Sequence, residues 1–176
     1  PRFIPWVEPI NVAVGGNISI TGVASATSNL TLKLNGTTIN TANNATTISA
    51  NPTITTTCAQ QVFLEGNNGS TIVKDSFSFY IAPATNVAAL PAGVQEGINY
   101  AGNNTSATLV LYAPNKTNVV VIGDFTNWAV QCAYQMNRTP DGNYYWITIN
   151  GLTPGTEYGY QYLVDNSIRT ADPYTQ

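Results

Sequence analysis

The sequence predicts an all-β protein built from two tandem immunoglobulin-like β-sandwiches. Helical periodicity is almost absent, and proline, glycine or Asn-Gly turn signals interrupt the chain about every 8–12 residues, which is the rhythm of short strands in a sandwich. The length of 176 residues exceeds the ~100 residues of one such sandwich. Between the turn signals, apolar and polar residues alternate, which is typical of antiparallel strands with one buried face.

The first predicted domain spans residues 1–83. Three of its stretches alternate apolar and polar residues and are predicted strands: 18–21, 30–34 and 76–81. Asn35-Gly36 directly follows the second of these. Because both residues tolerate positive φ, we expect a two-residue hairpin turn at this position.

Residues 84–95 lack alternation and contain Pro91 and Gly93, so we expect them to form a linker. The second predicted domain, residues 96–176, restarts the strand pattern. Its run Val119–Ile122 is continuously apolar, which is typical of a strand buried on both faces. Asp141-Gly142 lies between two strand-like stretches and predicts a hairpin. Four alternating residues then share one face of a later strand: Tyr158, Tyr160, Tyr162 and Val164.

Composition excludes several classes of function. Only 9% of residues are charged, the net charge is −3, and the six Lys and Arg residues are scattered, so we expect no nucleic-acid partner. Histidine is absent, which excludes Ser-His-Asp catalysis and histidine metal sites. No EF-hand loop or acidic repeat occurs, so we expect no metal and no cofactor. No apolar run approaches the ~20 residues of a membrane helix, so we expect no membrane insertion.

The two cysteines, Cys58 and Cys132, fall in opposite predicted domains. Neither has a second thiol or a basic neighbour at the spacing of a metal or catalytic site. They are either buried thiols or a disulfide between the domains. The low charge is typical of secreted proteins, so we expect an extracellular, cell-surface or periplasmic location. Because the chain begins with Pro1 and ends abruptly, we expect it to be a piece of a longer protein.

Three motifs of the second domain together resemble a known family. They are Gly123-Asp124-Phe125-Thr126-Asn127-Trp128, the turn Asp141-Gly142, and the stretch from Pro154-Gly155 to Val164-Asp165. Over residues 96–176 the combination resembles the early-set β-sandwich at the N-terminus of isoamylase, pullulanase and glycogen-branching enzymes. The same sandwich is the glycogen-binding domain of AMP-activated kinase β subunits. The closing segment, Arg169 to Tyr174, resembles the chain that enters the catalytic barrel in Bacteroidetes-type family-13 α-amylases.

This resemblance implies a non-catalytic N-terminal accessory region of a secreted glycoside hydrolase that acts on starch or glycogen. Such a region would pack on the catalytic barrel of the same parent chain and bind an α-glucan (starch, glycogen or a maltooligosaccharide). Two alternatives stay open. One is a free-standing glucan-binding module, and the other is a structural tandem of immunoglobulin-like domains on a surface protein.

The candidate carbohydrate-binding residues are Trp128, Asn127 and Gln161. In glucan-binding members of the family a surface tryptophan occupies the position of Trp128, and a lysine occupies that of Gln161. An exposed tryptophan can stack on the apolar face of a sugar ring while amide side chains bind its hydroxyl groups. The alternative is that Trp128 packs in the core or at a domain interface.

We expect no catalytic residue in this chain. Glycoside hydrolysis requires two carboxylates that flank the scissile bond, and no acidic pair has that signature. Asp141 and Asp165 lie at turns, and Asp172 precedes Pro173, where it sets chain direction. For Asp124 we expect a hydrogen bond to nearby backbone N–H groups.

Overall fold

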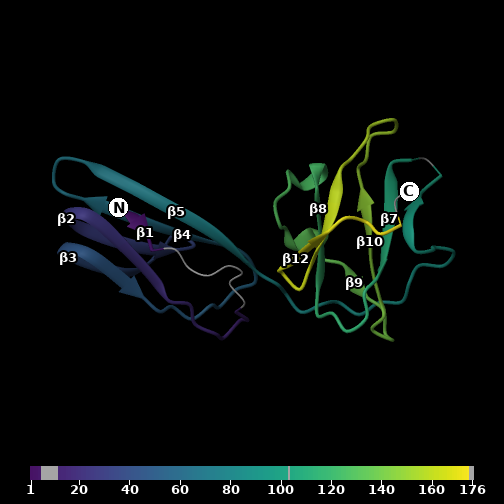
Figure 1. Ribbon diagram of the computed structural model, residues 1–176, viewed down its shortest axis with the longest axis horizontal. Helices are drawn as coiled ribbons and strands as arrows, with labels where there is room; N and C mark the ends of the chain where they lie inside the picture. The colour runs from purple at the N-terminus through teal and green to yellow at the C-terminus, as the bar shows by residue number, and fades with distance from the viewer. Residues whose placement is uncertain (5–11, 103, 175–176) are drawn as a thin grey trace. The chain divides into compact units, whose positions relative to one another are not determined.

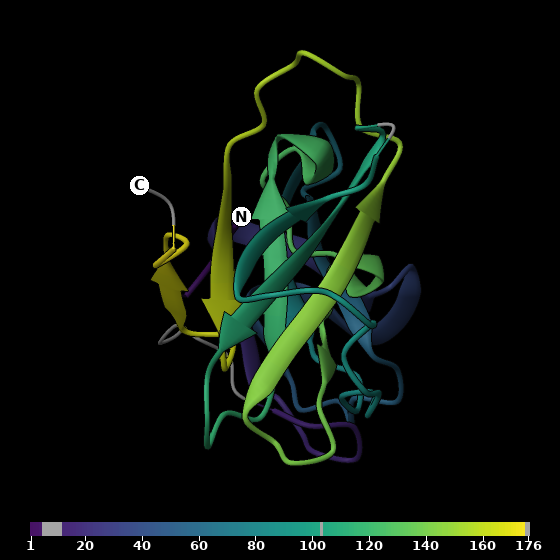
Figure 2. The ribbon, with the colours of Figure 1, turned by 90° about the vertical axis from the view of Figure 1, so that its right-hand side faces the viewer.

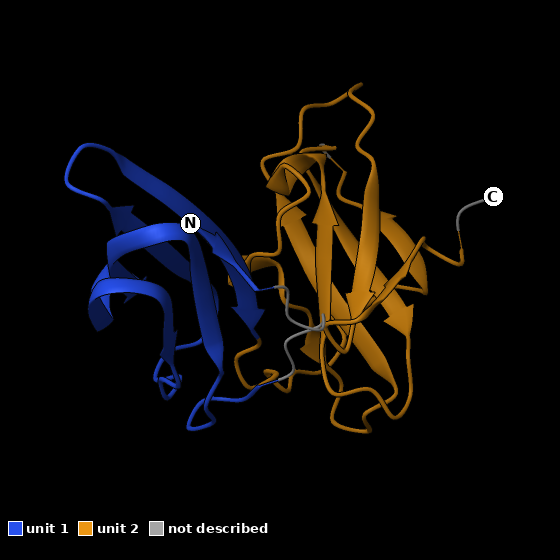
Figure 3. Ribbon diagram, turned by 60° about the vertical axis from the view of Figure 1, so that its left-hand side comes forward, with its two compact units in different colours: residues 1–81 blue, residues 82–176 orange. Residues whose placement is uncertain are grey.

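The computed structural model describes residues 1–4, 12–102 and 104–174, and it divides the chain into two compact units, Pro1–Ile81 and Ala82–Gln176 (Figures 1 and 3). Within the described residues, regular structure consists of β-strands and two short 3-10 helices, so the predicted all-β class is confirmed. In that same part of the chain, no helix has the length and apolar character needed to cross a membrane.

The first unit is one antiparallel sheet. Its strands are β1 (Arg2–Phe3), β2 (Ile20–Leu34), β3 (Thr37–Ala50), β4 (Cys58–Asn67) and β5 (Ile72–Ile81). They follow the order β1-β2-β4-β5, and β3 also pairs with β2. The β2–β3 ladder changes register between Val23 and Leu30, and such irregularities bend a strand. Because these strands join in one sheet, the immunoglobulin-like arrangement of this unit stays a prediction.

The core of the first unit follows the predicted alternation. Leu30 and Leu32 on β2 are buried, and they pack with apolar side chains of β4 such as Val62 and Leu64. Asn35 and Gly36 both have positive φ, 50° and 83°, as the expected two-residue turn requires. The turn between β2 and β3 is therefore confirmed.

The second unit is a two-sheet sandwich (Figure 2). Its strands are β6 (Gly97–Tyr100), β7 (Ser106–Tyr112), β8 (Val119–Gly123), β9 (Asn137–Arg138), β10 (Tyr144–Asn150), β11 (Tyr160–Val164) and β12 (Ile168–Thr170). One sheet has the order β6-β7-β10-β9 and the other β12-β11-β8. The helices η1 (Asp124–Thr126) and η2 (Cys132–Tyr134) lie in the β8–β9 connection.

Side chains from both sheets form the core of the second unit. Tyr145 on β10 and Tyr162 on β11 are fully buried in it, together with Val164, and Tyr160 packs against it. The predicted shared face is therefore confirmed for Tyr160, Tyr162 and Val164, whereas Tyr158 lies before the strand begins. All five residues of β8 are buried, as the continuous apolar run indicates.

Residues 84–95, which we expected to form a linker, are hydrogen-bonded within the second unit. Val87 forms a parallel bridge with Arg138. The Ala88 amide donates to the carbonyl of Arg138 at 2.9 Å, and the Trp146 indole donates to the carbonyl of Ala88 at 3.1 Å. The segment thus continues the sheet at the edge formed by β9, through hydrogen bonds of its main chain. Its small residues do not alternate between apolar and polar, so the sequence pattern gives no sign of this pairing.

Candidate functional site

The loop after β8 is held by its own side chains. Thr126 is buried, and its hydroxyl accepts from the Gly123 amide and donates to the Gly123 carbonyl, both at 3.0 Å. The chain then leaves η1 through two successive residues in the left-handed region, Asn127 at φ 51° and Trp128 at φ 58°. The Trp128 amide closes the turn by donating to the Gly123 carbonyl at 2.9 Å.

A left-handed tryptophan is unusual. Asparagine visits this region readily, whereas for a bulky residue the conformation costs roughly 1–2 kcal/mol. Backbone strain of this kind persists where the surrounding structure holds it, and it concentrates at functional sites. The Trp128 side chain that this backbone carries is 43% exposed to solvent.

Asp124 fixes the direction of the Trp128 indole. One carboxylate oxygen, Oδ1, accepts from the indole Nε1 at 2.9 Å, and the other, Oδ2, accepts from the amide of Gly159 at 2.6 Å. The Asp124 amide in turn donates to the Gly159 carbonyl at 3.0 Å. The nearby N–H that Asp124 binds is therefore a side-chain indole rather than the expected backbone amide, and the backbone amide that it binds lies 35 positions away along the chain. Asp124 couples the tryptophan loop to the beginning of β11.

The structure brings Trp128 and Gln161 to the same face. Tyr160 and Tyr162 point into the core, so Gly159 and Gln161 alternate to the outer face. The Trp128 ring lies on this outer face, because a Cβ placed on Gly159 would stand 3.3 Å from its Cζ2 atom. Gln161 is half-buried, one alternation further along from Gly159. Asn127 is exposed beside Trp128, and its backbone caps η1.

The remaining acidic residues of this unit serve structural hydrogen bonds. The Asp165 carboxylate accepts from the amide and hydroxyl of Thr117, both at 2.8 Å, which ties the β11–β12 turn to the residues before β8. Burial alone would raise the pKa of Asp165, but these bonds outweigh it and lower the pKa. Asp141 accepts from Thr139 and Asn143 across the β9–β10 turn.

Asp172 differs from the expectation that it only sets chain direction. It is buried, and its carboxylate accepts from the hydroxyl groups of Tyr160 and Tyr162 and from the Tyr174 amide. Burial, reinforced by Asp172, raises the pKa of both tyrosines. Asp172 therefore anchors the segment after β12 to the core. Among the described residues, no group of three or more His, Cys, Asp or Glu could hold a metal ion.

Trp146 and the two cysteines also have defined places. Trp146 lies on the face of β10 opposite Tyr145, where it is half-buried and outside the central core cluster. Cys58 begins β4 in the first unit and Cys132 begins η2 in the second. Their pairing stays a prediction.

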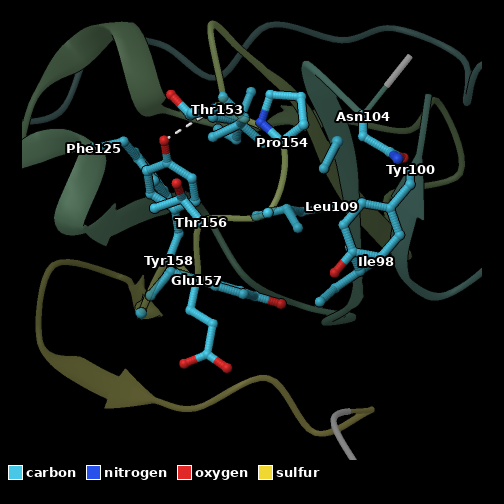
Figure 4. Close-up of a pocket in the computed structure, with 16 residues that line it drawn as sticks. Ile98, Tyr100, Asn104, Leu109, Phe125, Thr153, Pro154, Thr156, Glu157 and Tyr158 are labelled. Atoms are coloured by element: carbon cyan, nitrogen blue, oxygen red, sulfur yellow. Dashed lines mark hydrogen bonds between the residues drawn. The ribbon is translucent and has the colours of Figure 1, made fainter. Parts of the chain in front are cut away.

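The second unit also contains a cavity of about 670 Å³ that is lined by residues of both sheets (Figure 4). Its lining includes Tyr100 from the end of β6, Phe125 from η1 and the loop before β11. Sequence reasoning missed this feature because its residues are spread from 98 to 160. One signal was available: Tyr158 continues the alternation of β11 to a position before that strand begins.

The second unit thus combines a two-sheet fold with an exposed tryptophan loop. Residues 96–175 match the family model of Carbohydrate-binding module 48, the isoamylase N-terminal domain. Modules of this family occur in enzymes that act on starch and glycogen. The match falls within the second unit.

Individual relatives cover only part of the chain. The 1,4-alpha-glucan branching enzyme GlgB of Butyrivibrio fibrisolvens is 35% identical over 66 residues, which are 36% of this chain and 10% of that protein. The chain thus spans about a tenth of the length of this curated relative. The Group B Streptococcus pullulanase SAP in complex with maltotetraose has a TM-score of 0.37 at 11% identity, over 89% of this chain and 22% of the pullulanase. A Bacteroides uniformis β-glucuronidase 2 has a TM-score of 0.34 at 10% identity, over 86% and 27%.

Proposed function

We propose that this chain is a non-catalytic accessory region of a starch- or glycogen-acting glycoside hydrolase, and that its second unit binds α-glucan through the face of Trp128. The match of residues 96–175 to a carbohydrate-binding family supports this proposal. In the proposed parent protein the second unit packs on a catalytic barrel. The protein acts outside the cell, at its surface or in the periplasm.

The exposed side chain of Trp128 carries the proposal. A tryptophan kept for packing would be largely buried, whereas this one is 43% exposed, in a strained backbone conformation, with its indole N–H held by Asp124. An exposed aromatic residue in an unfavourable backbone conformation is expected where function, rather than stability, determines the residue at that position.

The geometry suits a glucose ring. The indole presents a flat apolar surface to the C–H face of the sugar, and it does not need to reorient on binding because Asp124 already fixes it. Gln161 lies on the same face and offers one amide donor pair and one acceptor to the hydroxyl groups. Asn127 offers the same groups beside the indole. No bond is made or broken in this mechanism.

Such a module helps its enzyme by raising the local concentration of glucan near the catalytic site. A domain that holds one part of a glucan chain converts capture of the next part into an intramolecular event. The gain depends on the length of the chain between the two sites rather than on new chemistry. The proposal therefore predicts that the module increases the activity of its enzyme more on long glucans than on short oligosaccharides.

Affinity electrophoresis tests the proposal. The 176-residue chain is run in native gels with and without soluble starch, beside the variants Trp128→Ala and Tyr112→Ala. Tyr112 is an exposed aromatic residue at the end of β7, in the sheet that does not contain β8 or β11. Its truncation therefore controls for the general loss of an exposed aromatic side chain. We expect starch to retard the wild type and Tyr112→Ala but not Trp128→Ala. Equal retardation of all three would place the site elsewhere, and no retardation of any would favour a structural role.

A further inference from the structure

The cavity of the second unit is lined by residues of both sheets. Ala107 and Leu109 on β7 and Ile149 on β10 line it from one sheet, and Tyr160 lines it from the other. Asn104 and residues 152–159 of the loop 151–159 also line it. The Leu152 amide donates to the Thr105 carbonyl at 2.9 Å, which joins this loop to the residues just before β7. The result is a bounded cleft, and Leu109 and Ile149 of its lining belong to the apolar core.

Aromatic rings stand on opposite sides of this cleft. In Figure 4, Phe125 and Tyr158 lie on one side, and Tyr100 and Ile98 lie on the other. Tyr100 is 70% exposed, the largest exposed fraction among the exposed large hydrophobic residues of the described chain. A side chain that exposed contributes little to folding, so its position at a cavity mouth is available for binding.

Hydrogen bonds hold the loop that lines the cleft. The Tyr158 hydroxyl accepts from the Thr153 amide at 3.0 Å, and this bond closes the loop on itself. The same loop turns through Gly155, at φ 81°, and the Thr156 amide donates to the Thr153 carbonyl at 3.2 Å. At its far end, Gly159 is tied to Asp124. A preformed site of this kind loses little of its binding free energy to ordering.

The chemistry of the lining selects a neutral, hydroxyl-rich ligand. Among the described lining residues none is lysine or arginine, and Glu157 is the one charged side chain. Phosphorylated or otherwise anionic ligands therefore have no counter-charge there. Apolar rings alternate with neutral polar groups, namely Asn104, Thr153 and Thr156. Its volume lies within the ~300–1,000 Å³ range of small-molecule sites.

The cleft adjoins the Trp128 face through one residue. Gly159 lines the cavity, and the position of its missing Cβ is also 3.3 Å from the Trp128 ring. Gly159 is therefore common to the cavity lining and to the surroundings of the Trp128 ring. The backbone at Gly159 is the partition between the two surfaces.

We propose that this cleft is a second α-glucan subsite, in which Tyr100 stacks on a glucose ring and the loop 151–159 supplies hydrogen bonds to its hydroxyl groups. The choice of an α-glucan rests on the proposed function, whereas the cleft itself rests on its geometry. Two adjacent subsites on one rigid unit hold a single chain more tightly than either does alone.

The test is a titration of the full chain with maltohexaose, followed residue by residue by two-dimensional NMR of backbone amides and the Trp128 indole. We expect two groups of signals to shift in the wild type: the cleft group, which includes Asn104 and Thr156, and the tryptophan group, which includes Asn127. In Tyr100→Ala the shifts of the cleft group disappear, and the affinity falls about tenfold, which is the scale of one lost aromatic contact. In Trp128→Ala the cleft group still shifts. Tyr112→Ala, a matched tyrosine truncation outside the cleft, behaves as wild type.

The possible results distinguish the second subsite in the cleft from the proposed site at Trp128. A tryptophan group that shifts alone, or a cleft group that shifts equally in Tyr100→Ala, overturns the second subsite and leaves the Trp128 site standing. A cleft group that shifts alone supports the subsite and removes Trp128 as the binding residue. Absence of any shift overturns both. Because Tyr100 is so exposed, loss of folding in Tyr100→Ala is not expected, and the unchanged amide spectrum of the free variant checks this.

Discussion

The ring of Trp128 lies against the open face of Gly159, where a Cβ would stand 3.3 Å from Cζ2 of the indole and 3.3 Å from Oδ2 of Asp124. A side chain at position 159 therefore competes for the space that the indole occupies. Glycine at this position allows the tryptophan loop and the beginning of β11 to approach one another. The exposed ring thus depends on a residue that is distant in the sequence.

Substitution of Gly159 should displace Trp128. We expect Gly159→Val to weaken starch binding at least as much as Trp128→Ala and to destabilise the unit by about 1–3 kcal/mol through overpacking. Gly159→Ala should have a smaller effect, because its one carbon makes tight but adjustable contacts. Affinity electrophoresis and urea unfolding measure the two effects. Adding Trp128→Ala to Gly159→Val should change binding no further, and an additive loss would contradict the displacement.

Two substitutions of Asn127 distinguish the role of its backbone conformation from that of its side-chain amide. It occupies the left-handed region, so Asn127→Ala should lower the free energy of unfolding by about 1 kcal/mol, while Asn127→Gly should leave it nearly unchanged. The glycine variant removes the amide without disturbing the loop. If the amide binds sugar, Asn127→Gly lowers the affinity for maltohexaose with no change in the urea midpoint. Unchanged affinity would show that Asn127 serves only the backbone of the Trp128 turn.

Gln161 should contribute hydrogen bonds rather than apolar contact. We expect Gln161→Leu, which keeps the side-chain volume, to weaken maltohexaose binding about fivefold, the equivalent of roughly 1 kcal/mol for one hydrogen bond. Gln161→Lys restores a hydrogen-bond donor and should bind close to wild type. Isothermal titration calorimetry measures both. Leucine equal to wild type would remove Gln161 from the site.

Stability should fall at alkaline pH. Burial raises the pKa of Tyr160 and Tyr162 well above the value near 10 of an unfolded chain, and it raises the pKa of Tyr80 to about 12. A raised pKa contributes stability that is present below pH ~10 and is lost as pH rises toward the folded-state pKa. We expect the free energy of unfolding to be level between about pH 8 and 9.5 and to decline above pH ~10. Urea unfolding across this range, with phenolate absorbance followed in parallel, measures the decline.

The variant Tyr160→Phe, which removes one of the raised groups, is the control for this prediction. Its unfolding free energy should decline less steeply above pH ~10 than that of the wild type. A wild-type stability independent of pH up to about 12 would contradict the assignment of the raised pKa values to buried tyrosines.

The cysteines have a direct test. An extracellular or periplasmic location favours a disulfide between Cys58 and Cys132. We expect the denatured chain to take up no alkylating reagent before reduction and two equivalents after it, as read from the intact mass. Two equivalents without reduction would instead identify both residues as thiols.

The sequence alone determined the all-β class, the Asn35-Gly36 turn and the inward face of the tyrosine strand. These features depend on short-range rules: alternation sets which side chains face the core, and positive φ selects asparagine and glycine. The exposed position of Trp128 was left open, because the motif around it is compatible with both packing and binding.

Only the tertiary structure decided how the site is built. For Asp124 the sequence predicts a hydrogen bond to nearby backbone N–H groups, yet its carboxylate joins the Trp128 indole to the Gly159 amide. Asp172, which we expected to set chain direction, is buried against the hydroxyl groups of two tyrosines. The hydrogen bonds of residues 84–95 to the β9 edge and the cleft beside Tyr100 have the same origin. These features depend on hydrogen bonds or contacts between segments that are far apart in the chain. Neither hydrophobic alternation nor residue spacing carries information about which distant segments meet.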